Sequence, residues 1–194
     1  MESLTVIIPD SASWTDDQLF DFCAANHDLH VERDADGTIH LMPLTGGFTG
    51  RRNFKLIPPI ESWNTRGERE AGVGFDSSTG FVLPNGAMRS PDVAWLGTDR
   101  WEALTPEQQR KFVPLCPDFV LELRSDTDRL IDVQAKMDEW MANGCRLGWL
   151  VDPETRRTWV YRPGAEPEVV PFDAALDGGE VMPGLRVCLA DVLG

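Results

Sequence analysis

Two acidic residues interrupt stretches of the sequence that otherwise have the composition of buried strands. Asp92 precedes the apolar residues 93–96, and Glu122 lies inside the apolar residues 119–123. A lone carboxylate in a buried strand is costly unless it is paired or binds a cation. Either acid can instead face solvent at a strand end or pair with an arginine, and their spacing alone does not separate these alternatives.

A helix expected over residues 128–143 adds polar groups to this picture. Its apolar residues recur with helical periodicity and form one face. Gln134 falls within that face, where its amide needs hydrogen-bond partners, and Lys136 falls on the border. A border lysine can pack its stem on Trp140 and extend its ammonium group to a site at the strand edge, although a surface lysine explains the same pattern.

Taken together, these groups have the chemistry of metal-dependent phosphodiester hydrolysis. Carboxylates from two adjacent strands bind a hard divalent cation through oxygen. Such a cation lowers the pKa of a bound water and neutralises a phosphate. A nearby lysine stabilises the developing negative charge or orients the water. Histidine is not required, which fits a chain with only three histidines.

The elements that must position these groups alternate between helices and strands. The order strand, helix, strand in the second half predicts an α/β or α+β sheet with a crossover helix. Residues 46–50 are expected to be a flexible Gly-rich connection, and Ser125 and Asp128 a capping box. The expected helices are 15–25, 51–63 (irregular because of Pro58 and Pro59), 105–112 and 128–143. The expected strands are 29–32, 38–42, 73–76, 81–83, 92–96, 119–123, 146–151, 158–161 and 168–171.

Length and charge limit the possible partners. A chain of 194 residues is expected to form one domain over residues 1–194. Its 18 basic and 32 acidic residues give a net charge of −14, which repels nucleic acid and anionic membranes at long range. A role on nucleic acid therefore requires a local basic patch or bound cations.

Cysteine usage and hydropathy favour a location in the cytoplasm. The four cysteines form no CxxC pair, and we expect reduced thiols in the cytoplasm. The chain opens without the features of a signal peptide, and its apolar runs are too short to span a membrane.

Several longer stretches resemble one known family. They are VERDADGTIHLMPLTGGFTGRRN, GFDSSTGFVLPNGAMRSPDVAW, FVPLCPDFVLELRSDTDRL, QAKMDEWMANGCRLGWLVDP and VYRPG, which lie between Leu29 and Gly164. In order and spacing they are similar to the Uma2 family, also called DUF820, of restriction-endonuclease-like proteins. The resemblance implies the PD-(D/E)XK fold, a mixed β-sheet flanked by helices with a β-hairpin-rich N-terminal half.

The same resemblance implies roles for individual residues. Pro91-Asp92 matches the PD element and Glu122 the (D/E) element, so Asp92 and Glu122 are the expected metal ligands. Arg124 stands at the usual lysine position, and Lys136 matches the lysine that this family carries on the following helix. Glu32 matches an acid of the first hairpin, and Gln134 a recurrent polar position. The sequence departs from the family at Asp126, usually Pro, and at Trp140, often Tyr.

The activity implied is that of a DNA endonuclease that depends on Mg²⁺ or Mn²⁺ and acts as a homodimer. In this interpretation Asp92, Glu122, Lys136 and Glu32 are catalytic, and Arg51, Arg52, Arg124 and Gln134 contact substrate. A non-catalytic nucleic-acid-binding or protein-interaction module on a degenerate nuclease scaffold is the alternative, and the charge of −14 favours it. A small-molecule hydrolase would use the same metal in a closed pocket.

Three structural expectations follow. The carboxylates of Asp92 and Glu122 converge from neighbouring strands. Lys136, and not Arg124, reaches them, although alternation places Arg124 on the same face of the strand as Glu122. Because Glu32, Asp92 and Glu122 lie together, at least one of them has a raised pKa in the absence of metal.

Overall fold

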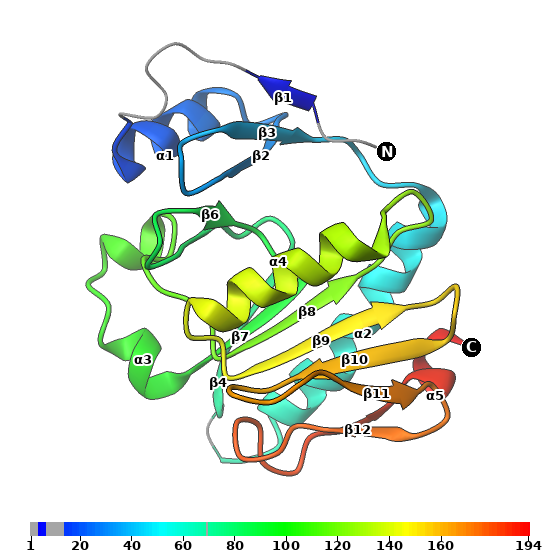
Figure 1. Cartoon of the computed structure of the whole chain (residues 1–194). Helices are drawn as coiled ribbons and strands as arrows, with labels where there is room; N and C mark the ends of the chain where they lie inside the picture. Colours follow the sequence, from blue (N-terminus) through cyan, green and yellow to red (C-terminus); the bar gives the residue numbers. More distant parts are fainter. Residues whose placement is uncertain (1–3, 7–13, 69) are drawn as a thin grey trace.

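A six-stranded mixed sheet forms the centre of the molecule (Figure 1). The computed structural model describes residues 4–6, 14–68 and 70–194. The strand order is β11-β10-β9-β8-β7-β4, in which β8 and β9 are parallel and the other neighbours antiparallel. The strands are β4 (Gly72–Asp76), β7 (Val93–Gly97), β8 (Phe119–Leu123), β9 (Leu147–Asp152), β10 (Arg157–Tyr161) and β11 (Glu168–Pro171).

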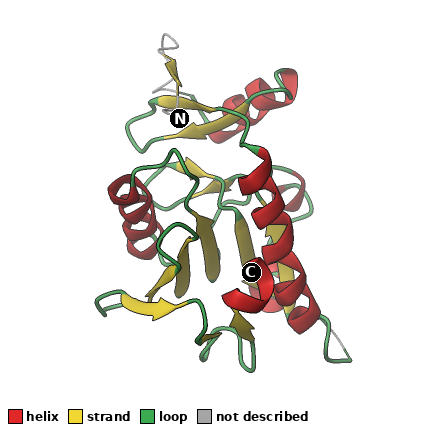
Figure 2. Ribbon diagram, turned by 90° about the vertical axis from the view of Figure 1, so that its right-hand side faces the viewer, coloured by secondary structure: helices red, strands yellow, loops and turns green. Residues whose placement is uncertain are grey.

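Helices cover both faces of this sheet (Figure 2). Helix α4 (Leu130–Ala142) makes the crossover that the parallel pair β8 and β9 requires, and it lies on one face. Helices α2 (Gly47–Asn64) and α5 (Leu189–Leu193) pack on the other face. The small sheet of β12 (Ala175–Asp177) and β13 (Arg186–Cys188) adds to the core on that second face.

Side-chain alternation in β8 decides which way Glu122 points. Phe119, Leu121 and Leu123 belong to the core cluster under α2, whereas Val120 belongs to the cluster under α4. Because successive side chains in a strand point to opposite faces, Glu122 faces α4.

A second sheet contains the N-terminal hairpin and carries further charged groups. Its order is β1-β3-β2-β6-β5, and α1 (Asp16–Ala25) packs against it through Leu19. The expected hairpin is present as β2 and β3, so Glu32 lies on a strand of this sheet. The strands are β1 (Leu4–Val6), β2 (His30–Arg33), β3 (Ile39–Met42), β5 (Phe81–Val82) and β6 (Met88–Arg89).

Helix α2 is longer and more regular than the sequence predicts. It begins at Gly47, within the stretch expected to be flexible, and continues through Pro58 and Pro59. Leu56, Ile60 and Trp63 are buried against the sheet, and this packing holds the helix across the prolines.

The helix expected over residues 105–112 is wrong. After helix α3 (Thr98–Glu102), the segment forms turns and only a short 3₁₀ helix, η2 (Gln108–Arg110). Thr105 and Gln108 cap one another, but the Val113 N–H donates to the Gly80 carbonyl and the Val113 carbonyl accepts from Val82. These bonds draw the chain into an extended path, and the helix ends after a single turn.

The expected capping box before α4 is also wrong. The helix begins at Leu130, two residues later than expected, and its N-cap is Arg129. The Asp128 carboxylate accepts the Ser125 N–H at 2.8 Å and so stabilises the turn before the helix.

Two further observations concern the cysteines and the hydropathy of the helices. The four cysteines, Cys23, Cys116, Cys145 and Cys188, are free thiols. None of the helices in the described residues combines the length and the apolar character of a membrane span.

Candidate active site

Asp92 lies directly before β7, and its carboxylate is hydrogen-bonded to both β8 and α2. Its Oδ2 accepts the Leu123 N–H at 2.7 Å, and its Oδ1 accepts the side-chain amide of Asn53 at 2.7 Å. Burial raises the pKa of Asp92, and the Leu123 N–H, Lys136 and Asn53 offset only part of this effect. These contacts hold the carboxylate beside Glu122, because the register pairs Val93 with Leu121.

Glu122 is a buried acid held by α4. Its Oε1 accepts the indole N–H of Trp140 at 2.8 Å and lies 3.0 Å from Lys136 Nζ. Burial raises the pKa of Glu122 to about 7, since the favourable charge of Lys136 is opposed by the charges of Asp92 and Glu32. The expected raised pKa is therefore present in two of the three acids, although burial contributes more to it than like charge.

Lys136 joins the two sheets at this point. Its Nζ lies 3.0 Å from Glu122 Oε1 and 3.0 Å from Glu32 Oε1, and it donates to the Ser90 carbonyl at 3.1 Å. Burial lowers the pKa of Lys136, but the two carboxylates outweigh it, so the pKa lies above its usual value and the side chain stays charged. The structure thus brings Lys136 to the acids from the helix.

A glycine on β9 allows α4 to lie close enough for this reach. A Cβ atom added at Gly148 would overlap the terminal methyl of Met137, the residue after Lys136. Both Met137 and Trp140 are fully buried. The approach of the helix to the sheet therefore determines where the ammonium group lies.

Glu32 is held from three directions. Its Oε1 accepts the Ser90 N–H at 3.1 Å in addition to contacting Lys136, and its Oε2 lies 3.9 Å from Arg89. Burial raises the pKa of Glu32, but Lys136, Arg89 and the Ser90 N–H together bring it below its usual value. Glu32 is therefore ionised at neutral pH, where Glu122 is only partly ionised, and it anchors the lysine.

Arg124 lies apart from this cluster. Its Nη1 donates to Asp152 Oδ2 at 2.9 Å and lies 3.0 Å from Glu154, while its Nε donates to the Asp128 carbonyl at 3.1 Å. Asp152 is fully buried on the neighbouring parallel strand β9, so the arginine is directed toward β9 and not toward Asp92.

The other predicted substrate-binding residues occupy different positions. Arg51 is exposed on α2, and Arg52 lies 3.4 Å from Asp126, the residue that departs from the family pattern. Gln134 is half-buried on α4, but in the described part of the chain its side chain has no hydrogen-bond partner. The structure therefore does not link Gln134 to the acids.

Two side chains of the site, those of Asn53 and Arg89, were not predicted from the sequence. Asn53 binds Asp92, and its own Oδ1 is buried without a hydrogen-bond partner among the described residues. Arg89 contacts Glu32 and also binds Glu139 at 2.5 Å and Asp34 at 2.7 Å. The sequence offered one indication for each residue. Asn53 directly follows Arg51-Arg52, and Arg89 directly precedes Ser90-Pro91.

The donor set fits a magnesium-like ion. Mg²⁺ takes oxygen ligands and is usually held by one or two carboxylates together with water and substrate phosphate. Asp92 and Glu122 supply such carboxylates, and the unpartnered Asn53 Oδ1 is a further oxygen beside Asp92. Within the described residues no group of three or more His, Cys, Asp or Glu could hold an ion, so an all-protein cage is not present there.

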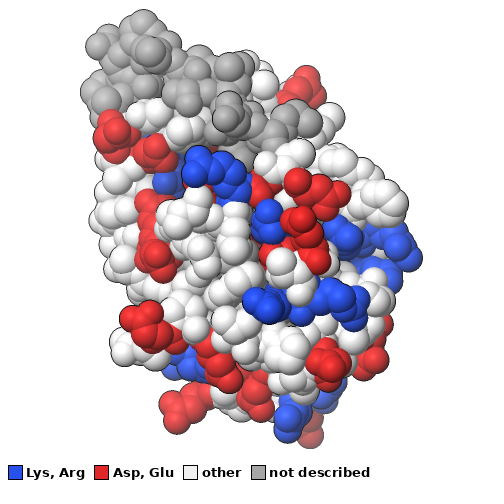
Figure 3. Space-filling view, turned by 45° about the vertical axis from the view of Figure 1, so that its right-hand side comes forward, with Lys and Arg blue, Asp and Glu red and all other residues white. Residues whose placement is uncertain are grey.

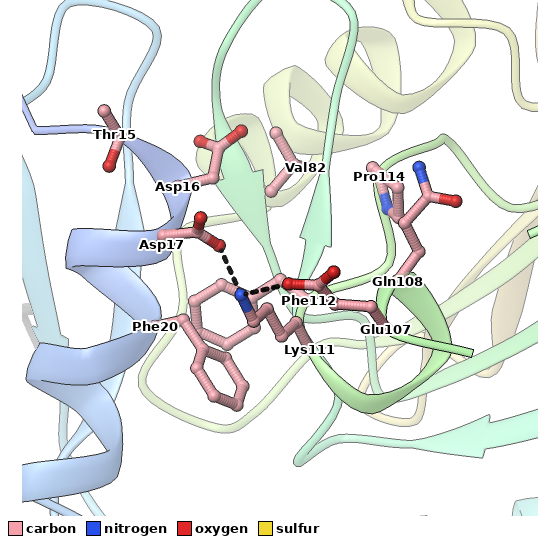
Figure 4. Close-up of a pocket in the computed structure, with 10 residues that line it drawn as sticks. All are labelled: Thr15, Asp16, Asp17, Phe20, Val82, Glu107, Gln108, Lys111, Phe112 and Pro114. Atoms are coloured by element: carbon pink, nitrogen blue, oxygen red, sulfur yellow. Dashed lines mark hydrogen bonds and ion pairs between the residues drawn. The ribbon is translucent and has the colours of Figure 1, made fainter. Parts of the chain in front are cut away.

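Two surface hollows lie outside this cluster. One, of about 330 Å³, lies between α1 and residues 107–114, where Lys111 binds Asp17 at 2.9 Å and Glu107 at 3.1 Å (Figure 4). The other, of about 420 Å³, lies between α2 and β4 and includes Val93, the neighbour of Asp92. Neither is lined by Glu122, Lys136 or Glu32.

Comparison with known proteins identifies the family. Residues 16–191 match the sequence profile of Uma2, which is described as "putative restriction endonuclease". The chain is a member of the Uma2 family. The resemblance seen in the sequence is thereby confirmed over nearly its whole length.

A solved structure shows the same fold as this Uma2 protein. It is described as a putative nuclease belonging to DUF820 from Anabaena variabilis, with 20% sequence identity and a TM-score of 0.70. The match covers 84% of this chain and 89% of that chain, and it confirms the restriction-endonuclease-like α/β fold. No curated protein matches the chain.

Proposed function

We propose that this Uma2 protein is a metal-dependent DNA endonuclease that hydrolyses phosphodiester bonds. The observation that carries the proposal is the ammonium group of Lys136, which lies 3.0 Å from both Glu122 and Glu32 at the end of the sheet where Asp92 lies. The carboxylates of Asp92 and Glu122 can bind a cation, and the charged lysine beside them can bind a phosphate. Membership of a family of restriction-endonuclease-like proteins supports the same assignment.

Asp92 and Glu122 are the residues that would hold Mg²⁺ or Mn²⁺. When bound, such an ion supplies a Lewis acid and lowers the pKa of water at the site. The side chain of Asn53 and the N–H of Leu123 fix the orientation of Asp92, and the Trp140 indole fixes that of Glu122.

Lys136 supplies the positive charge that the protein itself brings to the phosphate. Its raised pKa keeps it protonated, so it can donate to a phosphate oxygen while negative charge develops. Glu32 and the Ser90 carbonyl also contact the ammonium group, so its position does not depend on Glu122 alone.

Cleavage of plasmid and single-stranded DNA in Mg²⁺, Mn²⁺ or EDTA tests the proposal. We expect cleavage that EDTA abolishes and that Asp92→Asn reduces at least about 100-fold. Asp138→Asn, an exposed acid of α4, is the matched control and should retain full activity. Absence of metal-dependent cleavage from the wild-type protein on both substrates would reject the assignment.

The second candidate function is a non-catalytic binding module on the same scaffold. The net charge of −14 favours it, because affinity for DNA depends largely on neutralising phosphates. Titration calorimetry with Mn²⁺ separates the two functions. Heat that disappears in both Asp92→Asn and Glu122→Gln supports the enzyme, and its absence from the wild-type protein supports the module.

The remaining proposals concern assembly and location. We expect residues 1–194 to act as one domain and the protein to form a homodimer, since two sites are needed to cut two strands. Sedimentation analysis measures the mass directly. The free thiols suit the cytoplasmic location that we propose.

A further inference from the structure

The first part of α2 has an unusual charge for this protein. Residues 47–60 contain three basic residues, Arg51, Arg52 and Lys55, and no acid, in a chain with a net charge of −14. Of these three cations, only Arg52 has an ion-pair partner among the described residues, which is Asp126 at 3.4 Å. Helix α2 begins on the right-hand side of Figure 1, and Figure 3 brings that side forward and shows Lys and Arg gathered toward its right edge.

Two aromatic side chains are exposed beside these cations. Phe48 is 72% exposed and Phe54 is 76% exposed, whereas the aromatic residues of the main core are buried. A rise of 1.5 Å per helical residue places them about 9 Å apart along the axis. Exposed apolar side chains that lie next to cations are typical of a binding surface.

This basic-aromatic segment, residues 48–55, is continuous with the candidate site. Asn53 lies between Arg52 and Phe54 in the sequence, and its side chain donates to Asp92 at 2.7 Å. A ligand that lies along the exposed face of the segment is therefore bound by the same helix that orients Asp92, the acid that we assign to the metal.

We propose that the basic-aromatic segment binds an unpaired nucleic-acid strand. Arg51, Arg52 and Lys55 contact its phosphates, and Phe48 and Phe54 stack on its bases. Proteins that bind single strands combine these two features, because every base offers a flat face to an aromatic ring. Duplex DNA keeps those faces covered in its own stack, so the rings favour single strands or unpaired ends.

This inference rests on the proposed nuclease function and specifies the substrate for it. A second copy of the chain is the competing occupant of the segment. A symmetric contact through the segment would place Arg51, Arg52 and Lys55 against the same three cations of the second copy, whereas a nucleic-acid strand offers phosphates that are complementary to them.

The test is fluorescence anisotropy in EDTA with a labelled single strand of about 20 nucleotides and a duplex of the same sequence. We expect Phe54→Leu and Phe48→Leu each to weaken single-strand binding at least about 5-fold and to change duplex binding less than about 2-fold. Arg51→Ala and Lys55→Ala should weaken binding to both. The controls are Arg110→Ala on η2 and Val169→Ala on β11, both exposed, and they should bind like wild type.

Two results would overturn the inference. One is wild-type single-strand affinity in both leucine variants, whose retained folding is checked by thermal unfolding. The other is an unchanged oligonucleotide affinity combined with conversion of a dimer to a monomer by Phe54→Leu, which would assign the segment to self-association.

Failure of the inference is distinguishable from failure of the nuclease function. Binding is measured without metal and does not require cleavage. If the protein cleaves DNA but the leucine variants bind normally, only the role of the segment is rejected. If those variants lose single-strand binding but the wild-type protein never cleaves, only the nuclease function is rejected.

Discussion

At the scale of single residues, Lys136 occupies the position that decides the electrostatics of the site. Its charge lowers the pKa of both Glu32 and Glu122, but the pKa of Glu32 lies below its usual value whereas burial keeps that of Glu122 near 7. Both acids are buried, and they differ because Glu32 also contacts Arg89 and accepts the Ser90 N–H. A cation that binds Glu122 competes with a proton as well as with the lysine.

The raised pKa of Glu122 predicts how stability changes with pH. The folded protein holds this proton up to about pH 7, whereas the unfolded chain releases it near 4.5. Stability is therefore lost as the pH rises from about 4.5 to about 7, and the loss is constant above that range. Urea unfolding in EDTA at pH 5 and pH 8 measures it. We expect a larger loss for wild type than for Glu122→Gln, and an equal loss would place the titration on another group.

Substitution of the two basic residues separates catalysis from folding. Lys136→Met leaves Glu32 and Glu122 without their shared cation, so we expect a loss of about 3 kcal/mol in stability and no detectable cleavage. Arg124→Ala leaves the buried Asp152 with fewer partners and should lower stability by about 1–3 kcal/mol with cleavage nearly unchanged. Thermal unfolding and the plasmid assay measure the two effects. Loss of cleavage in the arginine variant alone would transfer the basic role to Arg124.

At the scale of elements, the site depends on how three segments meet. The antiparallel register of β7 and β8 sets Asp92 beside Glu122, and α4 carries Lys136 over the same end of the sheet. Strand β4 pairs with the edge of β7 that faces away from β8. The packing of β4 against β7 therefore affects the position of Asp92.

Two glycines of β4 offer a matched test of this support. A Cβ at Gly72 would overlap the Leu96 carbonyl oxygen and lie 2.6 Å from the ring of Trp95, whereas a Cβ at Gly74 meets only a Glu61 oxygen at 3.8 Å. We expect Gly72→Ala to lower the free energy of unfolding by about 1–3 kcal/mol. Gly74→Ala should stay within about 0.5 kcal/mol of wild type. Similar values for the two variants in urea unfolding would show that β4 and β7 shift apart at little cost.

At the scale of the whole molecule, net charge opposes a nucleic-acid substrate and local charge must overcome it. The protein carries −14, and the buried acids of the site add negative potential where the phosphate must lie. Attraction then depends on the cations of α2 and on a bound metal ion, which reverses the local sign.

The small number of available cations predicts a weak dependence of binding on salt. Three phosphate contacts, from Arg51, Arg52 and Lys55, correspond to a slope of about −2 in a plot of log affinity against log salt for a single strand. We expect weak binding in EDTA and tighter binding in Mg²⁺ or Ca²⁺. Anisotropy across a salt series measures both. Tight binding without metal and a much steeper slope would reveal a large basic surface elsewhere.

The sequence by itself determined the features that depend on neighbouring residues. The apolar residues around Asp92 and Glu122 predicted their strands, and helical periodicity predicted the helix that carries Lys136. The Asp36-Gly37 turn between residues 29–32 and 38–42 predicted the hairpin of Glu32, and the family pattern predicted the fold. These features are local because period and turn chemistry act within a few residues along the chain.

Only the tertiary structure decided which groups meet. Arg124 and Glu122 lie two residues apart, yet Arg124 binds the buried Asp152 on β9. Lys136 on α4 contacts Glu122 instead. Asn53 reaches Asp92 across 39 positions of sequence, and Val113 ends the expected helix by bonding to β5 and its neighbour. Such contacts depend on strand register and helix approach, which are set by packing between distant segments and leave no periodic trace in the sequence.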